Sequence, residues 1–254
     1  MKHYQFAGII PARYASTRFP GKPLAMIGDK TMVQRVYEHA SRSIDIVFVA
    51  TDDMRIHDAV LKFGGNAVMT STEHYSGTDR CAEAVDSIMK QTGKIIDVVV
   101  NIQGDEPFIK PEQINLVKLS FNDHRVEIAT LVRKTTPGED IFNPNNPKVI
   151  LDSEGNAIYF SRAAIPFIRD FEPSEWSKNH VFLKHIGLYA YRTATLKKIT
   201  KLPGSSLEKA ESLEQNRWIE NGFRIRAAIT DWESISIDTP DDLQRVLEHP
   251  EQFQ

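Results

Sequence analysis

The chain of 254 residues is 41% hydrophobic and 26% charged, which is typical of a folded protein and long enough for one large core. Its 31 basic and 34 acidic residues give a formal net charge of −3, which excludes a general attraction to nucleic acid or to an anionic membrane surface. Because there is one cysteine, Cys81, and no zinc-ligand spacing, signal peptide or apolar run of membrane-spanning length, we expect a cytoplasmic protein without membrane insertion.

The first predicted element is a buried strand over residues 6–10, and a basic loop follows it. Pro11 is expected to end the strand's ladder, and the loop carries Arg13, Arg18 and Lys22. In an open α/β sheet ligands bind beyond the carboxyl ends of the strands, where arginine and lysine can hold phosphate oxygens. The loop therefore indicates a polyanion site, although a solvated basic loop is the alternative. The sequence has no Walker A loop and no Gly-x-Gly-x-x-Gly motif.

Helices and strands alternate along the next part of the chain. A helix is predicted after a Thr31 cap, and residues 46–50 form a second buried strand. A second helix opens at Thr51-Asp-Asp53 and ends at Gly64-Gly65. A third strand follows at residues 67–69. This rhythm is typical of βαβ units and predicts a mostly parallel sheet with right-handed crossovers.

The motif Ser76-Gly-Thr-Asp-Arg80 precedes a predicted helix that extends to about Met89. Ser76 or Thr78 can cap this helix, so an ordinary helix start is one explanation of the motif. Arg80 fits that explanation poorly, because a cation in the first turn opposes the helix dipole. Its presence indicates that an external anion is offered both the helix N-terminus and the guanidinium.

Residues 95–102 are the most β-branched run in the chain and predict a central strand. The strand runs into Gln103-Gly-Asp-Glu-Pro107. A carboxylate at the end of a central strand is well placed for a metal ion that holds phosphates, which makes Asp105 a candidate ligand. The alternative is a turn in which Asp105 bonds to its own backbone.

The βα rhythm breaks after a strand at residues 127–132, where Asn143-Pro-Asn-Asn-Pro147 follows. Beyond it lie shorter predicted strands at residues 148–152, 157–160 and 186–191. We expect this aromatic-rich segment to be an insertion that extends the sheet and builds a subunit interface.

A helix is predicted over residues 207–220 after the start signal Pro203-Gly-Ser-Ser206. One face carries polar residues at spacings of three and four, namely Glu208, Glu211, Glu214 and Gln215. Such a face usually points to solvent, but the mild repulsion between like charges leaves room for a ligand role.

Two further strands are predicted, over residues 223–229 and 234–237, before a final helix capped by Thr239. The residues from Thr239 onward are explained as an ordinary helix start and need no functional role. Asp238 precedes the cap and is not explained in this way. Asp238 lies at a strand end as Asp105 does, and two such carboxylates can share a magnesium ion.

Seven motifs, taken together and in order, resemble those of the 3-deoxy-manno-octulosonate (Kdo) cytidylyltransferases, also called CMP-Kdo synthetases. The resemblance covers essentially the whole chain. The first motif alone indicates only sugar nucleotidyltransferases, whereas the third and fifth narrow the class to Kdo enzymes. The motifs are Pro11-Ala-Arg-Tyr-Ala-Ser-Thr-Arg-Phe-Pro-Gly-Lys-Pro23, Ser76-Gly-Thr-Asp-Arg80, Val100-Asn-Ile-Gln-Gly-Asp-Glu-Pro107, Tyr159-Phe-Ser-Arg-Ala-Ala-Ile-Pro166, Lys184-His-Ile-Gly-Leu-Tyr189, Leu213-Glu-Gln215 and Asp238-Thr-Pro-Asp-Asp-Leu243.

The resemblance implies a nucleotide-diphospho-sugar-transferase-like α/β fold, a three-layer α/β/α sandwich around a mixed, mainly parallel sheet. It implies a single cytidylyltransferase domain with an inserted dimerisation segment at about residues 140–195. The implied reaction converts CTP and Kdo to CMP-Kdo and pyrophosphate, which activates Kdo for lipopolysaccharide biosynthesis. The implied cofactor is Mg²⁺, and the implied assembly is a homodimer.

The resemblance also implies roles for individual residues. The nucleotide would be held by Ala12, Arg13, Ser16, Arg18 and Lys22. The metal would be held by Asp105 and Asp238, and these two act in catalysis with Lys22 and Arg13. The sugar pocket would be lined by Arg80, Gln103, His185, Tyr189, Glu214 and Gln215.

Two other functions are compatible with parts of this pattern. A nucleotide-sugar-dependent glycosyltransferase usually carries an Asp-x-Asp metal motif, which is absent from this sequence. A non-catalytic nucleotide-binding protein would keep the basic loop without the chemistry, and the presence of both Asp105 and Asp238 speaks against it.

Overall fold

The computed structural model describes residues 4–249, and the chain divides into two compact units. Unit 1 comprises residues 1–115, 188–200 and 234–254, and unit 2 comprises residues 116–187 and 201–233. The expected insertion at 140–195 therefore contributes mainly to unit 2, and the single-domain organisation stays a prediction. None of the helices within residues 4–249 is both long and apolar enough to cross a membrane.

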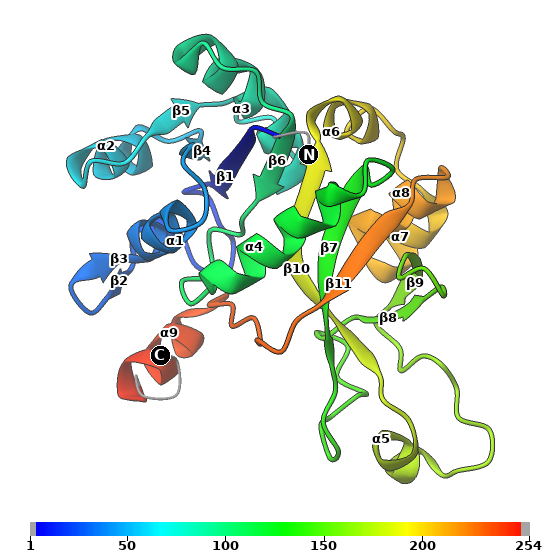
Figure 1. Cartoon of the computed structure of the whole chain (residues 1–254). Coiled ribbons are helices and arrows are strands. Elements are labelled where there is room, and N and C mark those ends of the chain that lie inside the picture. Colours follow the sequence, from blue (N-terminus) through cyan, green and yellow to red (C-terminus); the bar gives the residue numbers. More distant parts are fainter. Residues whose placement is uncertain (1–3, 250–254) are drawn as a thin grey trace. The chain divides into compact units, whose positions relative to one another are not determined.

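The sheet of unit 1 is built from parallel strands with one antiparallel strand beside them (Figure 1). β1 pairs in parallel with β4 and β6, β4 pairs in parallel with β5, and β10 runs antiparallel to β6. The strands are β1 (Phe6–Ala12), β4 (Val47–Thr51), β5 (Ala67–Met69), β6 (Val98–Asn101) and the second half of β10 (Leu183–Arg192). The predicted buried strands are confirmed, since every residue of β4 and β6 is buried.

The expectation that Pro11 ends the ladder is correct on one side of β1 only. Pairing with β6 stops at Ile9, where the missing proline N–H leaves no donor for a longer ladder. Pairing with β4 continues through Pro11 to Ala12, because the hydrogen bonds between β1 and β4 do not use the N–H group that Pro11 lacks. Ala12 is therefore the last residue of β1, and the basic loop, residues 13–22, starts after it.

Helices cover both faces of this sheet. The strand order places α1 and α2 on one face and α3 on the other, because right-handed crossovers run one way from β1 to β5 and return to β6. Thr31, Asp53 and Ser76 cap α1, α2 and α3 through their side chains, as the sequence indicates. The helices of unit 1 are η1 (Lys22–Leu24), α1 (Met32–Ser41), α2 (Met54–Lys62), α3 (Gly77–Thr92), α6 (Thr193–Ile199) and α9 (Pro240–Glu248), and α4 (Pro111–Leu119) begins in it.

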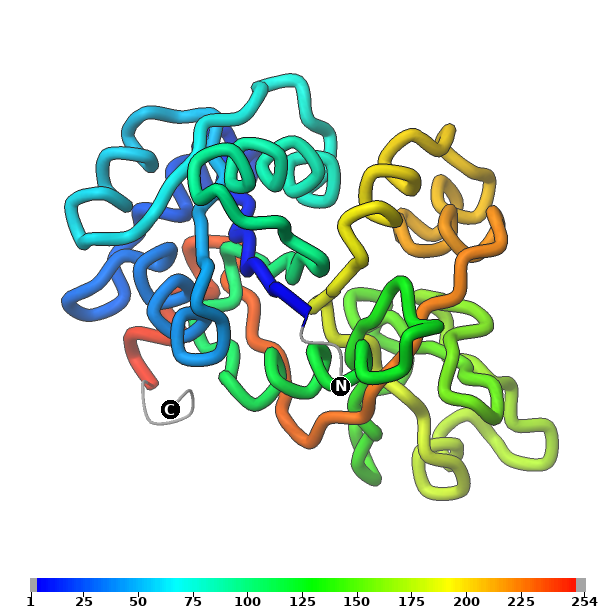
Figure 2. The backbone as a smooth tube through the Cα atoms, turned by 45° about the horizontal axis from the view of Figure 1, so that its top comes forward, coloured from blue at the N-terminus to red at the C-terminus, as the bar shows by residue number. Residues whose placement is uncertain are grey.

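The last helix of unit 1 packs against an early segment of the chain. Figure 2 shows the last helix, α9, beside the early segment that forms the hairpin of β2 (Met26–Ile27) and β3 (Lys30–Thr31). Ile27 and Met32 pack there against Ile237 and Val246 in a buried cluster. This packing fixes the segment that carries Asp238 against β2 and the start of α1.

Unit 2 contains two strand pairs and the first half of β10. β7 (Ile128–Lys134) pairs in parallel with β11 (Ile225–Ile229), and β8 (Lys148–Leu151) pairs antiparallel with β9 (Ala157–Ser161). Lys184 of β10 pairs with Lys148 of β8. The helices of this unit are η2 (Ser120–Asn122), η3 (Pro173–Glu175), α5 (Trp176–Asn179), α7 (Ser206–Glu211) and α8 (Glu214–Glu220).

Two predicted elements are wrong. The helix expected over residues 207–220 is two helices, because Ser212 adopts the left-handed conformation at φ 49° and ends α7. The strand expected over residues 234–237 does not form. Within the described residues, the Ile237 N–H donates to the Asp105 carbonyl at 2.9 Å, and this backbone hydrogen bond joins the segment to a loop and not to a strand of the sheet.

Candidate active site

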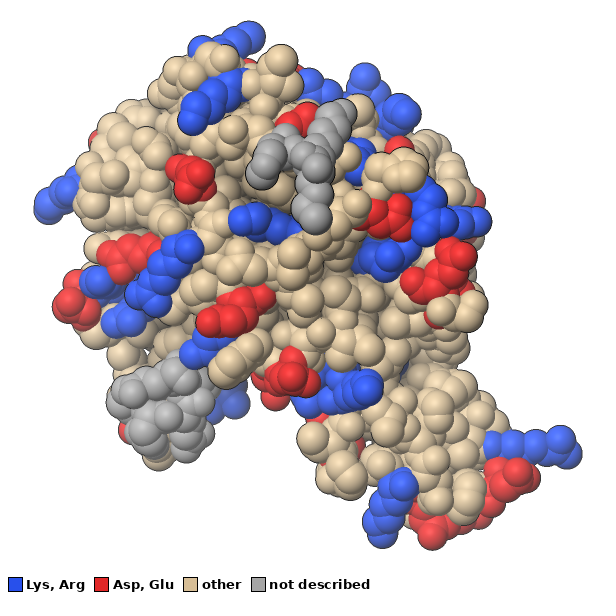
Figure 3. Space-filling model, viewed as in Figure 1, with Lys and Arg blue, Asp and Glu red and all other residues tan. Residues whose placement is uncertain are grey.

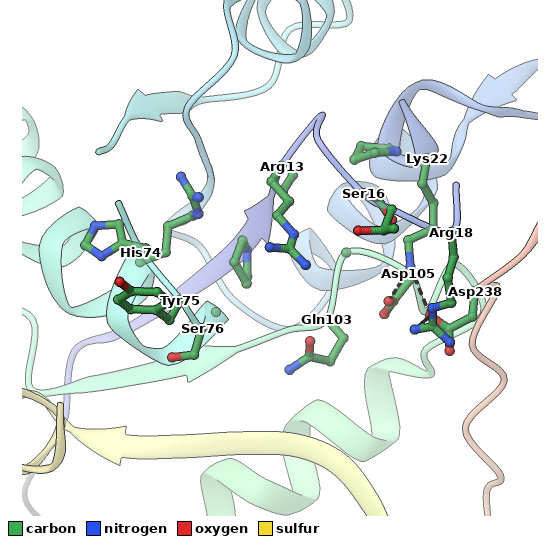
Figure 4. Close-up of a pocket in the computed structure, with 17 residues that line it drawn as sticks. Arg13, Ser16, Arg18, Lys22, His74, Tyr75, Ser76, Gln103, Asp105 and Asp238 are labelled. Atoms are coloured by element: carbon green, nitrogen blue, oxygen red, sulfur yellow. Dashed lines mark hydrogen bonds and ion pairs between the residues drawn. The ribbon is translucent and has the colours of Figure 1, made fainter. Parts of the chain in front are cut away.

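A pocket of about 310 Å³ lies in unit 1 at the carboxyl ends of β1 and β6. It is formed by the basic loop, the entry to α3, the segment after β6 and Asp238. Parallel strands bring their carboxyl ends to the same edge of a sheet, which explains why segments distant in sequence meet here. Figure 4 shows Asp105 and Asp238 beside Lys22 and Arg18 at one end, and His74, Tyr75 and Ser76 at the other.

Two glycines allow these segments to pack closely around Pro11. A Cβ atom on Gly104 would lie 2.9 Å from the Pro11 carbonyl oxygen, and one on Gly77 would lie 3.0 Å from the Pro11 ring. Because the first of these contacts is with backbone, a larger residue at Gly104 requires the floor of the pocket to move. The Gly in Gln-Gly-Asp is therefore needed for close approach.

The acidic and basic predicted residues converge at one end of the pocket. The Lys22 Nζ lies 2.7 Å from Asp105 Oδ2 and 3.2 Å from Asp238 Oδ1. Arg18 Nη2 lies 3.1 Å from the same Asp238 oxygen. The hydrogen bond from the Ile237 N–H to the Asp105 carbonyl joins the backbone next to Asp238 to the backbone of Asp105. The Lys22 ammonium thus bridges the two carboxylates, and Arg18 contacts one of them.

Asp238 lies beside Lys22 and Arg18, although the residues that follow it also form a complete helix start for α9. Thr239 caps α9, and the Asp242 carboxylate accepts the N–H groups of Asp238 at 3.1 Å and of Thr239 at 2.9 Å. These bonds occupy Asp242, so the Asp238 carboxylate is left to face the basic loop.

The carboxylate pair is chemically suited to Mg²⁺. Within residues 4–249 no group of three or more His, Cys, Asp or Glu side chains is arranged to hold a metal ion. Mg²⁺ is commonly bound through one or two carboxylates, with water and substrate phosphates completing its octahedron. Asp105 and Asp238 meet that requirement, and their role as metal ligands stays a prediction.

Arg80 has an internal partner that the sequence did not indicate. Arg80 is 3% exposed, and its guanidinium donates to Asp52 Oδ2 at 2.7 Å, to Thr70 Oγ1 at 2.6 Å and to the Ser71 carbonyl at 3.3 Å. Asp52 therefore offsets the cation in the first turn of α3. Arg80 still lines the pocket, as Gln103 does, and its role toward the sugar stays a prediction.

The other residues predicted for the sugar fall in both units. Tyr189, in unit 1, is buried and stacks on Tyr191 with ring centroids 5.8 Å apart. His185, in unit 2, has its Nε2 3.0 Å from Thr130 Oγ1, and burial lowers its pKa to about 3, so its imidazole is neutral at pH 7. Glu214 pairs with Arg217 at 3.0 Å, and Gln215 is buried at the start of α8.

Sequence reasoning missed three residues of the pocket region. Burial, together with the nearby charges of Asp105 and Asp238, raises the pKa of Glu106 to about 7. His74 lines the pocket and its Nε2 bonds to Glu83, which also accepts the Ser71 N–H at 3.0 Å. Glu106 lies within the motif Gln103-Gly-Asp-Glu-Pro107, and His74 and Glu83 lie on either side of Ser76-Gly-Thr-Asp-Arg80, which are the sequence signals for these residues.

Comparison with known proteins identifies the family. A family model described as cytidylyltransferase matches residues 7–228. Relatives from Parabacteroides distasonis and Bacteroides thetaiotaomicron, both named 3-deoxy-manno-octulosonate cytidylyltransferase, are 57% and 58% identical to the chain. The alignments cover 96% and 98% of this chain and 97% and 98% of the relatives. The chain belongs to the 3-deoxy-manno-octulosonate cytidylyltransferase family.

A solved member of this family confirms the predicted fold. The CMP:2-keto-3-deoxy-manno-octonic acid synthetase complexed with CTP is 38% identical, with a TM-score of 0.87 over 98% of this chain and 99% of that one. A 4-diphosphocytidyl-2C-methyl-D-erythritol synthase from Anaerococcus prevotii shares the fold at 16% identity, with a TM-score of 0.60 over 98% of this chain and 96% of that one. These likenesses confirm the predicted α/β fold of this chain, with helices on both sides of a mixed, mainly parallel sheet.

Proposed function

We propose that this protein converts CTP and Kdo to CMP-Kdo and pyrophosphate, the reaction that activates Kdo for lipopolysaccharide biosynthesis. The observation that carries the proposal is the convergence of Lys22 and Arg18 with Asp105 and Asp238 at the carboxyl edge of the sheet. The names of the relatives and the CTP in a similar structure support the choice of substrates.

The basic loop is suited to the charge that the reaction moves. Attack of the sugar's 2-hydroxyl on the α-phosphate releases pyrophosphate, whose negative charge must be balanced as it leaves. Cations come from Arg13, Arg18 and Lys22, and Ser16 provides a hydroxyl donor. We propose that these four residues bind the nucleotide together with Ala12. Placing these groups before the reaction avoids reorganisation in the transition state.

Asp105 and Asp238 are the residues that would hold Mg²⁺. When bound there, Mg²⁺ would lower the pKa of the sugar's 2-hydroxyl and balance charge on the α-phosphate. The Lys22 ammonium bridges the carboxylates and Arg18 contacts Asp238, so CTP binding is expected to draw both cations toward the phosphates and free the pair. No covalent intermediate with the protein is needed.

The sugar is proposed to contact Arg80, Gln103, His185, Tyr189, Glu214 and Gln215. The environment of His185 supports a particular role for that side chain. Because the imidazole is neutral at pH 7, it would hydrogen-bond to a sugar hydroxyl and would not pair with the carboxylate.

The proposed assembly is a homodimer joined through the inserted segment. Trp176 packs in a buried cluster with Ile141 and Phe182, and the rings of Phe142 and Phe167 lie 5.6 and 5.0 Å from its ring. Phe142 is 48% exposed and Phe167 is 74% exposed, so an apolar surface surrounds this cluster. A second copy of the chain would cover that surface.

Light scattering tests the dimer at micromolar concentration. The wild-type protein is expected to have twice the chain mass, and Phe167→Glu should shift it toward monomer with little change in melting temperature. A monomeric wild-type protein would overturn the proposed assembly.

Since CTP is a substrate, we expect the reaction to take place in the cytoplasm, where nucleoside triphosphates are supplied.

Pyrophosphate release from CTP and Mg²⁺, with and without Kdo, tests the reaction itself. Kdo-dependent release, with CMP-Kdo identified by mass spectrometry, is the expected result. Sialic acid and the 8-amino analogue of Kdo are the comparison substrates, and release with only one of these would replace the substrate while leaving the mechanism. No release with any sugar would favour a nucleotide-binding protein without catalysis, and consumption of CMP-sugars would favour a glycosyltransferase.

A further inference from the structure

The basic loop is folded around the main chain of one residue, Tyr14. The Tyr14 carbonyl accepts the N–H of Ser16 at 3.0 Å and the N–H of Gly21 at 2.9 Å. One carbonyl therefore ties together the two ends of the loop that contains Ser16 and Arg18. The second bond also positions Lys22, because Gly21 is the cap of η1, which starts at Lys22.

The Tyr14 ring covers the backbone of Gly21. Gly21 has a φ of +71°, and a Cβ atom on it would lie 3.2 Å from each of three atoms of the Tyr14 side chain. The positive φ favours glycine at this position, and a Cβ atom would in addition require the Tyr14 ring to shift by a few tenths of an ångström. The ring and Gly21 thus form one packed contact at the point where the loop enters η1.

Arg55 holds the same ring from α2. Its guanidinium carbon lies 3.3 Å from the Tyr14 ring centroid, the geometry of a stacked cation–π contact. The guanidinium is oriented by Asp53, with Nε 2.9 Å from Oδ1 and Nη2 2.6 Å from Oδ2. Asp53 is itself the cap of α2 and accepts the Arg55 N–H at 2.9 Å. The cation is therefore fixed to the start of a helix and already has its own anion.

We propose that Tyr14, stacked under Arg55 and packed on Gly21, is a positioning residue that ties the basic loop to the start of α2. The contact holds the loop in its binding conformation before CTP arrives. Neither Tyr14 nor Arg55 needs to touch the substrate, because their effect passes through the main chain to Ser16 and Lys22. The inference rests on the proposed function only in assigning the CTP phosphates to this loop.

A loop that is ordered in advance saves the ligand the entropy of ordering it. Loss of the contact should therefore weaken CTP binding and leave Kdo binding unchanged. An exposed cation–π contact corresponds to roughly a two- to five-fold effect, which we expect for Arg55→Ala because that side chain is 60% exposed. Tyr14→Leu removes both the stacking and the contact with Gly21, and should weaken CTP binding roughly ten-fold.

Calorimetric titration with CTP and with CMP tests this without requiring turnover. Tyr14→Leu and Arg55→Ala should lower the affinity for CTP more than the affinity for CMP, which lacks the β- and γ-phosphates. Tyr14→Phe keeps the aromatic face and should bind CTP as the wild type does. Lys62→Ala, an exposed lysine at the other end of α2, is the matched control. Steady-state kinetics should show a higher KM for CTP with the KM for Kdo unchanged.

A double-mutant cycle decides whether the two side chains act together. In the Tyr14→Leu background, Arg55→Ala should cause no further loss of CTP affinity. Additive losses, or unchanged CTP affinity in folded single variants with wild-type melting temperatures, would overturn the proposal. Failure of the wild-type protein to bind CTP at all would instead overturn the proposed function, so the two failures are distinguishable.

Discussion

Replacing Lys22 by methionine tests the electrostatics of the Asp105 and Asp238 pair. The Lys22 side chain is 14% exposed, and its ammonium contacts both carboxylates, at 2.7 and 3.2 Å. Hydrogen bonds to charged groups contribute about 1.5–3 kcal/mol each. Because Asp238 is 35% exposed and partly screened, we assign both contacts together only about 2 kcal/mol. A divalent ion that binds without nucleotide must displace this ammonium, so Lys22→Met should raise its affinity about 30-fold.

Electron paramagnetic resonance of Mn²⁺, used in place of Mg²⁺, measures this affinity without turnover. Lys22→Met should bind Mn²⁺ more tightly than the wild type in the absence of CTP, while its affinity for CTP falls. Lys30→Met is the control, because Lys30 makes a single carboxylate contact, with Glu38, outside the pocket. Adding Asp105→Asn to Lys22→Met should abolish the gain. Equal Mn²⁺ affinity in wild type and Lys22→Met, with both folded, would refute the reasoning.

Three further predictions follow from the site and its surroundings. Asp105→Asn should lose most of kcat while the calorimetric affinity for CTP changes less, and unchanged turnover would contradict the assigned metal role. Gly104→Ala should lower the free energy of unfolding by about 1–3 kcal/mol, because its Cβ would meet the Pro11 carbonyl at 2.9 Å. Gly204→Ala, whose Cβ meets only side-chain atoms at 3.5 Å or more, is the control in the same urea titration. His185 has a folded-state pKa of about 3, below the ordinary histidine value of 6.5, so the unfolded state binds more protons between these values and stability falls as the pH drops below 6.5. His185→Gln should remove up to about 1.4 kcal/mol per pH unit of that dependence in urea titrations from pH 7 to 5, and identical slopes in both proteins would contradict the burial of a neutral imidazole.

The surface charges agree with the composition and add little to the site. Figure 3 shows acidic and basic side chains interspersed over the face viewed, in keeping with the formal net charge of −3. The cations that matter for a polyphosphate are therefore those of the basic loop, brought together locally.

Local sequence patterns determined most of the elements of unit 1. The runs that became β4 and β6 are continuous and apolar, which is the pattern of strands buried on both faces. Thr31 is predicted as a cap, and Ser76 as one of two candidates with Thr78, because a cap depends only on its neighbours within one turn. Ser212 was missed because serine rarely adopts a left-handed conformation and no local signal marks one that does.

The motifs, read in order, determined the family and the residues to examine, since each motif is a short continuous segment. Tertiary structure alone decided which of these residues meet. Asp105 and Asp238 are distant in sequence, and their contact through Lys22 depends on how the segment before α9 packs against the basic loop. The same holds for the pairing of Arg80 with Asp52 and for the raised pKa of Glu106. Ion pairing and desolvation depend on neighbours in space, and the linear order of the chain does not specify those neighbours.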